Sequence, residues 1–255
     1  MIYVSSDLHG CDPQQFRQLL DRTGFRAEDF LFILGDVIDR GAHGAELLLW
    51  LTEQPNIQLI LGNHEALLLA CDFLFEEATD DSLDRLTPEK IMLMDNWLEN
   101  GGLPTIRGFG RMLKEQPELV DGILDYLRDA PLYEELEVSG RKFVLVHGGL
   151  ENFRLDRPLS DYAPGELLLA RPTLDTRYFP DATVIFGHTP TQFFGEAHHR
   201  RAVKTDSWIC IDTDAGAGYL PMLLRLDDMK EFYSEQDWTP PDPALIEEMI
   251  RKNLR

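Results

Sequence analysis

The sequence has few cysteines and lacks a long apolar stretch. Three cysteines, Cys11, Cys71 and Cys210, occur without CxxC spacing, and three thiols cannot all pair. We therefore expect free thiols in a reducing compartment. No stretch approaches the roughly 20 apolar residues that span a bilayer, which argues against a membrane protein. Because the amino terminus shows no basic or apolar leader, we expect a cytoplasmic protein.

Positive charge is also scarce. Lysine and arginine total 24 against 45 acidic residues, which gives a net charge of −21. Such a field repels nucleic acid and anionic membrane surfaces, so we expect neither as a partner. The length of 255 residues is enough for a sizeable core in one large or two small domains. Nothing in the composition indicates an oligomeric state.

Short apolar runs that alternate with helical patterns predict an α/β layered fold. Strands are expected at 2–5, 30–34 and 57–61, and later at 142–147, 183–188, 208–212, 222–226 and 231–233. Helices are expected after Asp12, an N-cap followed by a proline, and at 44–53. A helical insertion at about 66–141 carries helices at 65–77, 87–99 and 117–128. We expect one domain at 1–237, then a proline-rich connector and a helix at 244–254 packed on that domain.

Carboxylate, imidazole and amide side chains follow the predicted strands directly, where open α/β sheets place ligands. Six of them offer oxygen or nitrogen donors: Asp7, His9, Asp36, Asn63, His147 and His188. Donors of this kind without thiolates suit a borderline to hard divalent ion such as Mn, Fe or Zn. Their number predicts two ions that share one carboxylate. A single polar residue after a strand usually does no more than hydrogen-bond within its turn. Five strand ends that all carry possible ligands favour a metal site.

The ordered motifs around these residues resemble a known family. They read Asp7-x-His9-Gly10, Gly35-Asp36-x-x-Asp39-Arg40-Gly41, Gly62-Asn63-His64-Glu65, His147-Gly148-Gly149 and Gly187-His188. This set is similar to the calcineurin-like metallophosphoesterase signature, and to the bacterial and bacteriophage lambda type Ser/Thr protein phosphatases within its phosphoprotein phosphatase branch. The resemblance implies a β-sandwich flanked by helices, two divalent ions and a hydroxide nucleophile that bridges them.

The resemblance also implies roles for single residues. It gives Asp7 and His9 to the first ion, Asp36 to the bridge, and Asn63, His147 and His188 to the second ion. His64 would be the general acid, and Asp39 would orient it. Arg40 would bind the phosphate, and so would Arg171 through a looser local match; both offer planar forks suited to phosphate oxygens.

Three functions fit this pattern. The first is a manganese-dependent protein phosphatase that acts on phosphoserine or phosphothreonine in a phosphoprotein or phosphopeptide. The alternative is a symmetrical diadenosine tetraphosphate hydrolase, which shares the metal motifs; Glu65 and the Asp39-Arg40-Gly41 sequence favour the phosphatase. The third is a phosphoprotein-binding module without turnover, which the intact set of candidate residues disfavours. The Gly-rich break at Gly101 and Gly102, between Trp97 and Thr105, is either a simple helix end or a segment over the metal centre.

Overall fold

The computed structural model describes residues 1–75 and 86–234. The expected connector at 238–243, the expected helix at 244–254 and the end of the helix expected at 65–77 lie outside these residues. The three cysteines are free thiols. Among the described residues, no helix is both long enough and apolar enough to cross a membrane.

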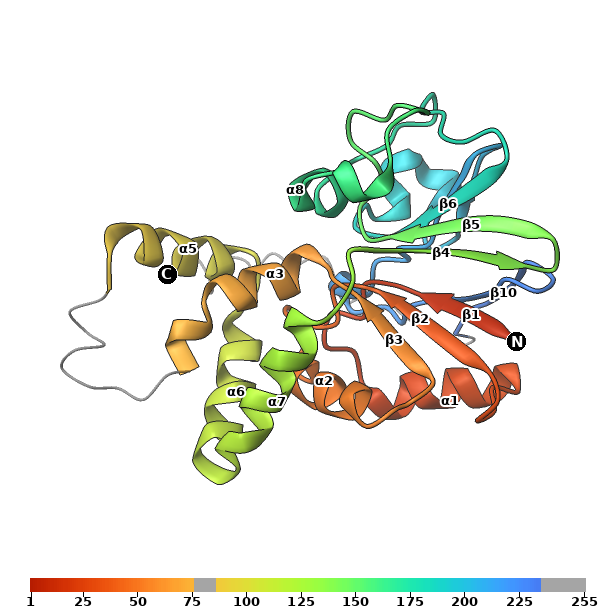
Figure 1. Cartoon of the computed structure of the whole chain (residues 1–255). Coiled ribbons are helices and arrows are strands. Elements are labelled where there is room, and N and C mark those ends of the chain that lie inside the picture. Colours follow the sequence, from red (N-terminus) through yellow and green to blue (C-terminus); the bar gives the residue numbers. More distant parts are fainter. Residues whose placement is uncertain (76–85, 235–255) are drawn as a thin grey trace.

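The first of two sheets has the strand order β10-β9-β1-β2-β3. Its parallel strands are β1 (Ile2–Ser5), β2 (Phe30–Leu34) and β3 (Ile57–Ile60), and its antiparallel strands are β9 (Leu223–Arg225) and β10 (Lys230–Phe232). Helices α1 (Pro13–Thr23) and α2 (Gly44–Thr52) cover its outer face (Figure 1). The Asp12 side chain caps α1 by accepting the Gln14 N–H at 2.8 Å, as the sequence predicted.

The second sheet has the strand order β4-β5-β6-β8-β7. Its central strands β5 (Arg141–Val146), β6 (Ala182–Phe186) and β8 (Trp208–Cys210) run parallel, while the edge strands β4 (Tyr133–Val138) and β7 (Val203–Lys204) run antiparallel to their neighbours. Helix α8 (Pro164–Leu168) and the adjacent loops pack on its outer face. The sequence did not predict β4, which carries three glutamates that an edge strand tolerates.

The inner faces of the two sheets pack together as one apolar core. Phe32 and Leu34 from the first sheet and Leu145 and Ile185 from the second belong to the same buried cluster. A second cluster joins the first sheet to its helices, and a third fills the outer side of the second sheet. The predicted layered α/β sandwich flanked by helices is therefore confirmed.

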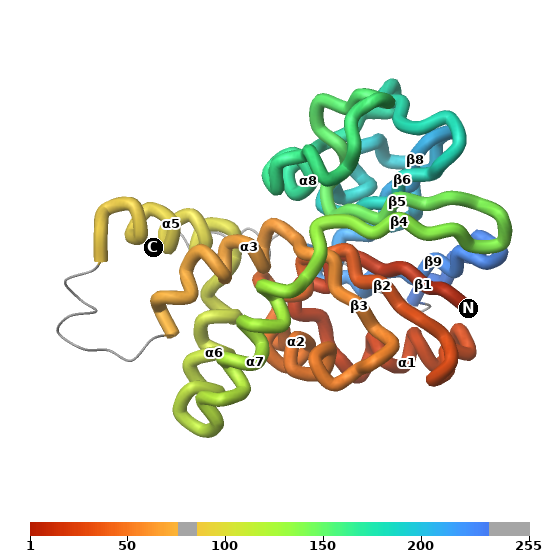
Figure 2. Tube along the Cα trace, in the orientation of Figure 1, coloured from red at the N-terminus to blue at the C-terminus, as the bar shows by residue number. Residues whose placement is uncertain are grey.

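Between β3 and β4 the described residues, 61–75 and 86–132, are mainly helical and lie at one end of the sandwich (Figure 2). The segment contains α3 (Asn63–Ala70), the short helix η1 (Asp72–Phe75), α5 (Pro88–Glu99), α6 (Leu103–Glu115) and α7 (Pro117–Arg128). The helices expected at 87–99 and 117–128 are present, but α6 was missed. Pro104, Gly108 and Gly110 weaken its helical signal, and its contacts with α2 and α7 supply the packing that makes it a helix. The single domain at 1–237 stays a prediction.

Candidate active site

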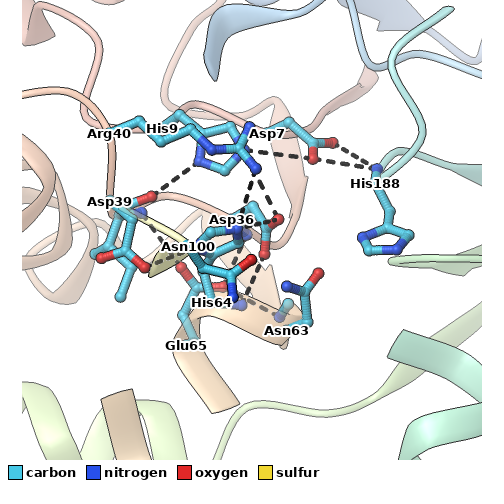
Figure 3. Close-up of polar contacts among 12 residues, drawn as sticks. Asp7, His9, Asp36, Asp39, Arg40, Asn63, His64, Glu65, Asn100 and His188 are labelled. Atoms are coloured by element: carbon cyan, nitrogen blue, oxygen red, sulfur yellow. Dashed lines mark hydrogen bonds and ion pairs between the residues drawn. The ribbon is translucent and has the colours of Figure 1, made fainter. Parts of the chain in front are cut away.

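The loops that follow β1, β2, β3, β5 and β6 meet at one edge of the sandwich. Figure 3 shows polar side chains of the loops after β1, β2, β3 and β6 gathered at this edge, among them Asp7, Asp36, Asn63 and His188. The six predicted metal ligands are all there, and they are Asp7, His9, Asp36, Asn63, His147 and His188. The parallel strands explain this convergence, because their carboxyl ends reach the same edge.

The backbone at this edge is unusual. Several non-glycine residues there have left-handed φ values: Asp7 at 51°, His9 at 42°, Asp36 at 53°, Asp39 at 70°, Arg40 at 65° and His188 at 60°. Such conformations cost about 1–3 kcal/mol each and persist only when the surroundings enforce them. Here the first two loops hold each other, since the His9 N–H donates to the Asp36 carbonyl at 2.8 Å. Strain concentrated in this way is typical of functional sites.

Asp36 lies at the middle of the centre with its two oxygens turned to different neighbours. Oδ2 is 3.8 Å from His9 Nε2, and Oδ1 is 3.4 Å from His147 Nε2. The carboxylate is 2% exposed. This geometry suits a carboxylate that serves two cations at once.

Two of the imidazoles are fixed with Nε2 facing the centre. His9 Nδ1 is 3.0 Å from the Ile38 carbonyl, and His147 Nδ1 is 2.7 Å from the Leu34 carbonyl. A carbonyl only accepts hydrogen bonds, so the proton belongs on Nδ1 and Nε2 is the atom that can bind a metal. Asn63 Oδ1 lies 2.9 Å from His147 Nε2, so this oxygen offers a second atom that could bind a metal ion at the same point.

The charges at the centre indicate a place for cations. Burial raises the pKa of Asp7 to about 6, and burial lowers the pKa of His9 and of His188 to about 3. Burial also lowers the pKa of His147, but the attraction of Asp36 and Asp7 outweighs it and raises this pKa to about 10. The neutral imidazoles of His9 and His188 and the buried carboxylates fit divalent cations, and a cation at this point would replace the proton on His147. The absence of thiolates favours borderline to hard cations.

His64 has the surroundings of an acid. Its Nδ1 donates to Asp39 Oδ2 at 2.6 Å, and its Nε2 lies 3.7 Å from Asp36 Oδ2. Burial lowers the pKa of His64, but Asp36 and Asp39 outweigh this effect and raise it. A protonated ring can donate its Nε2 proton to a leaving group. By distance alone, however, His9, Asp36 and His64 also form a group that could hold an ion.

Both predicted phosphate-binding arginines reach this centre. Arg40 Nη2 is 3.4 Å from His64 Nε2. Arg40 and Arg171 both line a pocket of about 190 Å³. Asp36, Asn63, His64 and His188 line the same pocket. The sequence around Arg171 matches the family pattern only loosely, yet the fold brings Arg171 to the same pocket as Arg40.

Glu65 has a part in the site that the sequence did not reveal. It is fully buried, and its carboxylate accepts the N–H groups of Asp36 at 2.7 Å, Val37 at 2.8 Å and Gly62 at 3.2 Å. It thus braces the loop that carries Asp36, and it does not line the pocket that Arg40 and Arg171 share. Spacing alone cannot separate such a brace from a ligand, because both follow the same strand.

Comparison with known proteins finds relatives that match large parts of this chain. The profile of the family described as calcineurin-like phosphoesterase matches residues 1–215. A symmetrical bis(5'-nucleosyl)-tetraphosphatase of Pseudomonas fluorescens is 29% identical over 196 residues, which cover 75% of this chain and 57% of that protein. Other curated relatives carry the same name over shorter segments. The chain spans about a quarter to just over half of the length of the curated relatives it matches.

Solved structures share the fold at low identity. A structure whose description proposes a diadenosine tetraphosphatase has a TM-score of 0.60 and 16% identity, and the match covers 91% of this chain and 92% of that one. A protein serine/threonine phosphatase of Saccharomyces cerevisiae has a TM-score of 0.50 and 16% identity, with 94% and 81% covered. The fold is therefore common to proteins described by different substrates.

Proposed function

The chain belongs to the calcineurin-like phosphoesterase family, and we propose that within this family it hydrolyses dinucleoside tetraphosphates. The observation that carries this proposal is the shared name of its curated relatives, the symmetrical bis(5'-nucleosyl)-tetraphosphatases. The sequence alone favoured a Ser/Thr protein phosphatase, and the comparisons support the alternative better.

Neither feature that favoured the protein phosphatase reports on the substrate. The Glu65 carboxylate accepts backbone N–H groups and would not contact a bound phosphoester. A glutamate at this position therefore does not indicate which substrate binds. Asp39 is bonded to His64, and Arg40 lies beside the same ring. A phosphate-binding Arg40 would serve either substrate. A protein phosphatase stays the second candidate because the same centre would serve a phosphoserine ester.

The proposed roles follow the geometry described above. Asp7 and His9 would hold one divalent ion, Asn63, His147 and His188 the other, and Asp36 both. When bound, two such ions would lower the pKa of water and neutralise phosphoryl oxygens; Mn is the first choice, with Fe or Zn possible. Arg40 and Arg171 would grip phosphate oxygens through paired N–H groups. His64, oriented by Asp39, would protonate the leaving oxygen.

Two clefts beside the centre support a substrate with a group at each end. One, of about 990 Å³, shares Arg40, Arg171 and His188 with the centre and contains Phe193. The other, of about 400 Å³ between α3, α5 and α8, shares Asn63 with the centre. A dinucleoside tetraphosphate carries its phosphates in the middle and a nucleoside at each end, so it matches this arrangement.

A direct substrate comparison tests the proposal. Metal-stripped protein would be incubated with and without added Mn. Hydrolysis of the central phosphoanhydride of diadenosine tetraphosphate would be measured beside phosphate release from a phosphoserine and phosphothreonine peptide pool. We expect Mn-dependent cleavage of the dinucleotide in preference to the peptides. A preference for the peptides would restore the protein phosphatase, and cleavage of neither would favour a binding module without turnover.

We expect Phe193, in the larger cleft, to stack on a base of the substrate. Phe193 is 72% exposed and lies in the same cleft as Arg171, so its ring is available to a nucleobase. Stacking of a base on an aromatic ring contributes about 1–3 kcal/mol. We therefore expect Phe193→Ala to raise the KM for diadenosine tetraphosphate about 5- to 150-fold, while kcat for phenyl phosphate is unchanged. Leu155→Ala, at another exposed apolar residue, is the control. An unaltered KM in Phe193→Ala would exclude this contact.

A further inference from the structure

The helical segment between β3 and β4 reaches into the active site through Asp39. This carboxylate is fully buried and accepts three side-chain hydrogen bonds. Its Oδ2 accepts the His64 Nδ1–H at 2.6 Å and the Trp97 Nε1–H at 2.8 Å, and its Oδ1 accepts the Thr105 hydroxyl at 2.6 Å. Two of the three donors therefore come from α5 and α6.

The same segment holds the backbone beside Asp39. The Asp39 N–H donates to Thr105 Oγ1 at 3.0 Å, and the Arg40 N–H donates to the Gly101 carbonyl at 2.9 Å. Asp39 and Arg40 both have left-handed φ values, a conformation that is stable only when the surroundings fix it. Thr105 and Gly101 supply those fixed points.

The two glycines between α5 and α6 are explained by these contacts. Gly101 has a φ of 96°, and a Cβ there would lie 2.9 Å from Arg40 Cγ. At Gly102 a Cβ would lie 2.6 Å from the Trp97 ring. The Gly-Gly pair thus permits the close approach that brings Trp97 and the Gly101 carbonyl to the site, in addition to ending α5.

We infer that Trp97 and Thr105 are positioning residues for the general acid. They fix the plane of the Asp39 carboxylate, Asp39 fixes the His64 ring, and His64 Nε2 is thereby held toward the phosphoryl group. Buried carboxylates that lack donors lose both their stabilisation and their orientation, so neither residue is replaceable by an apolar side chain of similar shape. The inference goes beyond the proposed substrate and rests only on the proposed role of the His64 and Asp39 pair.

A double-mutant cycle tests this inference. Thr105→Val removes the hydroxyl with little change of volume, and we expect kcat on phenyl phosphate to fall about 10- to 100-fold, the usual loss when a residue that orients an active group is removed. Thr105→Ser should restore most of it. In the His64→Asn background the same Thr105→Val change should have no further effect on kcat, because the group it positions is already gone.

Controls separate positioning from general damage. Thr23→Val removes a buried hydroxyl that bonds the Leu20 carbonyl away from the site, and kcat should not change. Should Thr105→Val fail to fold, Trp97→Phe keeps an aromatic side chain and removes the N–H donor, at the cost of some buried volume. The downfield proton resonance of the His64 to Asp39 hydrogen bond gives a readout without turnover, and it should shift in Thr105→Val and return in Thr105→Ser.

Two results would overturn the inference. One is an unchanged kcat and proton resonance in Thr105→Val and Trp97→Phe. The other is an equal fall of kcat in the wild-type and His64→Asn backgrounds, which would give both residues a purely structural role. Failure of the proposed substrate would leave the cycle intact, since it is measured on phenyl phosphate.

Discussion

Replacement of Asp36 by Asn is expected to abolish metal retention and activity together. The two Asp36 oxygens face different donor groups, His9 on one side and His147 on the other, so both proposed ions depend on one buried charge. Removing one partner of a buried charge interaction costs about 3–5 kcal/mol, equivalent to about a 10²- to 5 × 10³-fold loss of metal affinity. Elemental analysis after dialysis against Mn would measure the metal content.

A second buried aspartate provides the matched control. Asp29 is 4% exposed and pairs with the amino terminus at 2.6 Å, at the other end of β2 from Asp36. Asp29→Asn should lower stability and leave the metal content per folded molecule unchanged. Full metal occupancy in Asp36→Asn would contradict the bridging role.

The strand ends of this protein could be predicted because their chemistry is local. Each of β1, β2 and β3 is an apolar run followed directly by a polar turn, and period and turn residues are both visible in sequence. Parallel pairing then places the ends of consecutive strands at one edge. This is why Asp7, Asp36 and Asn63 could be grouped before any distance was known.

Other parts could not be predicted because tertiary contacts decide them. Helix α6 forms despite Gly108 and Gly110, and β4 forms despite its glutamates, since packing outweighs local propensity. Trp97 and Thr105 bond to a carboxylate 58 and 66 residues away in sequence, and no periodicity reveals such a contact. The cleft of Phe193 was equally hidden, because this residue lies outside every motif and only the fold brings it to the same cleft as Arg40, Arg171 and His188.

Replacement of His64 by Asn should lower kcat on phenyl phosphate about 10²- to 10⁴-fold, the usual contribution of general acid catalysis, without loss of metal. The reason is the leaving group. Phenol, like the tyrosine side chain, has a pKa of about 10, so it leaves poorly unless protonated. p-Nitrophenol is a much better leaving group and should be affected less, and kcat on the two esters measures the difference.

The same reasoning connects the acid to the proposed substrate. A nucleoside diphosphate leaving group resembles a phosphate whose second pKa is about 6 and needs little protonation, so His64→Asn should have its smallest effect on diadenosine tetraphosphate. His43→Asn, at an exposed histidine paired with Glu46, is the control. Metal loss in His64→Asn would place His64 among the ligands with His9 and Asp36. An equal fall of kcat on all three substrates would give it a role other than proton donation to the leaving oxygen.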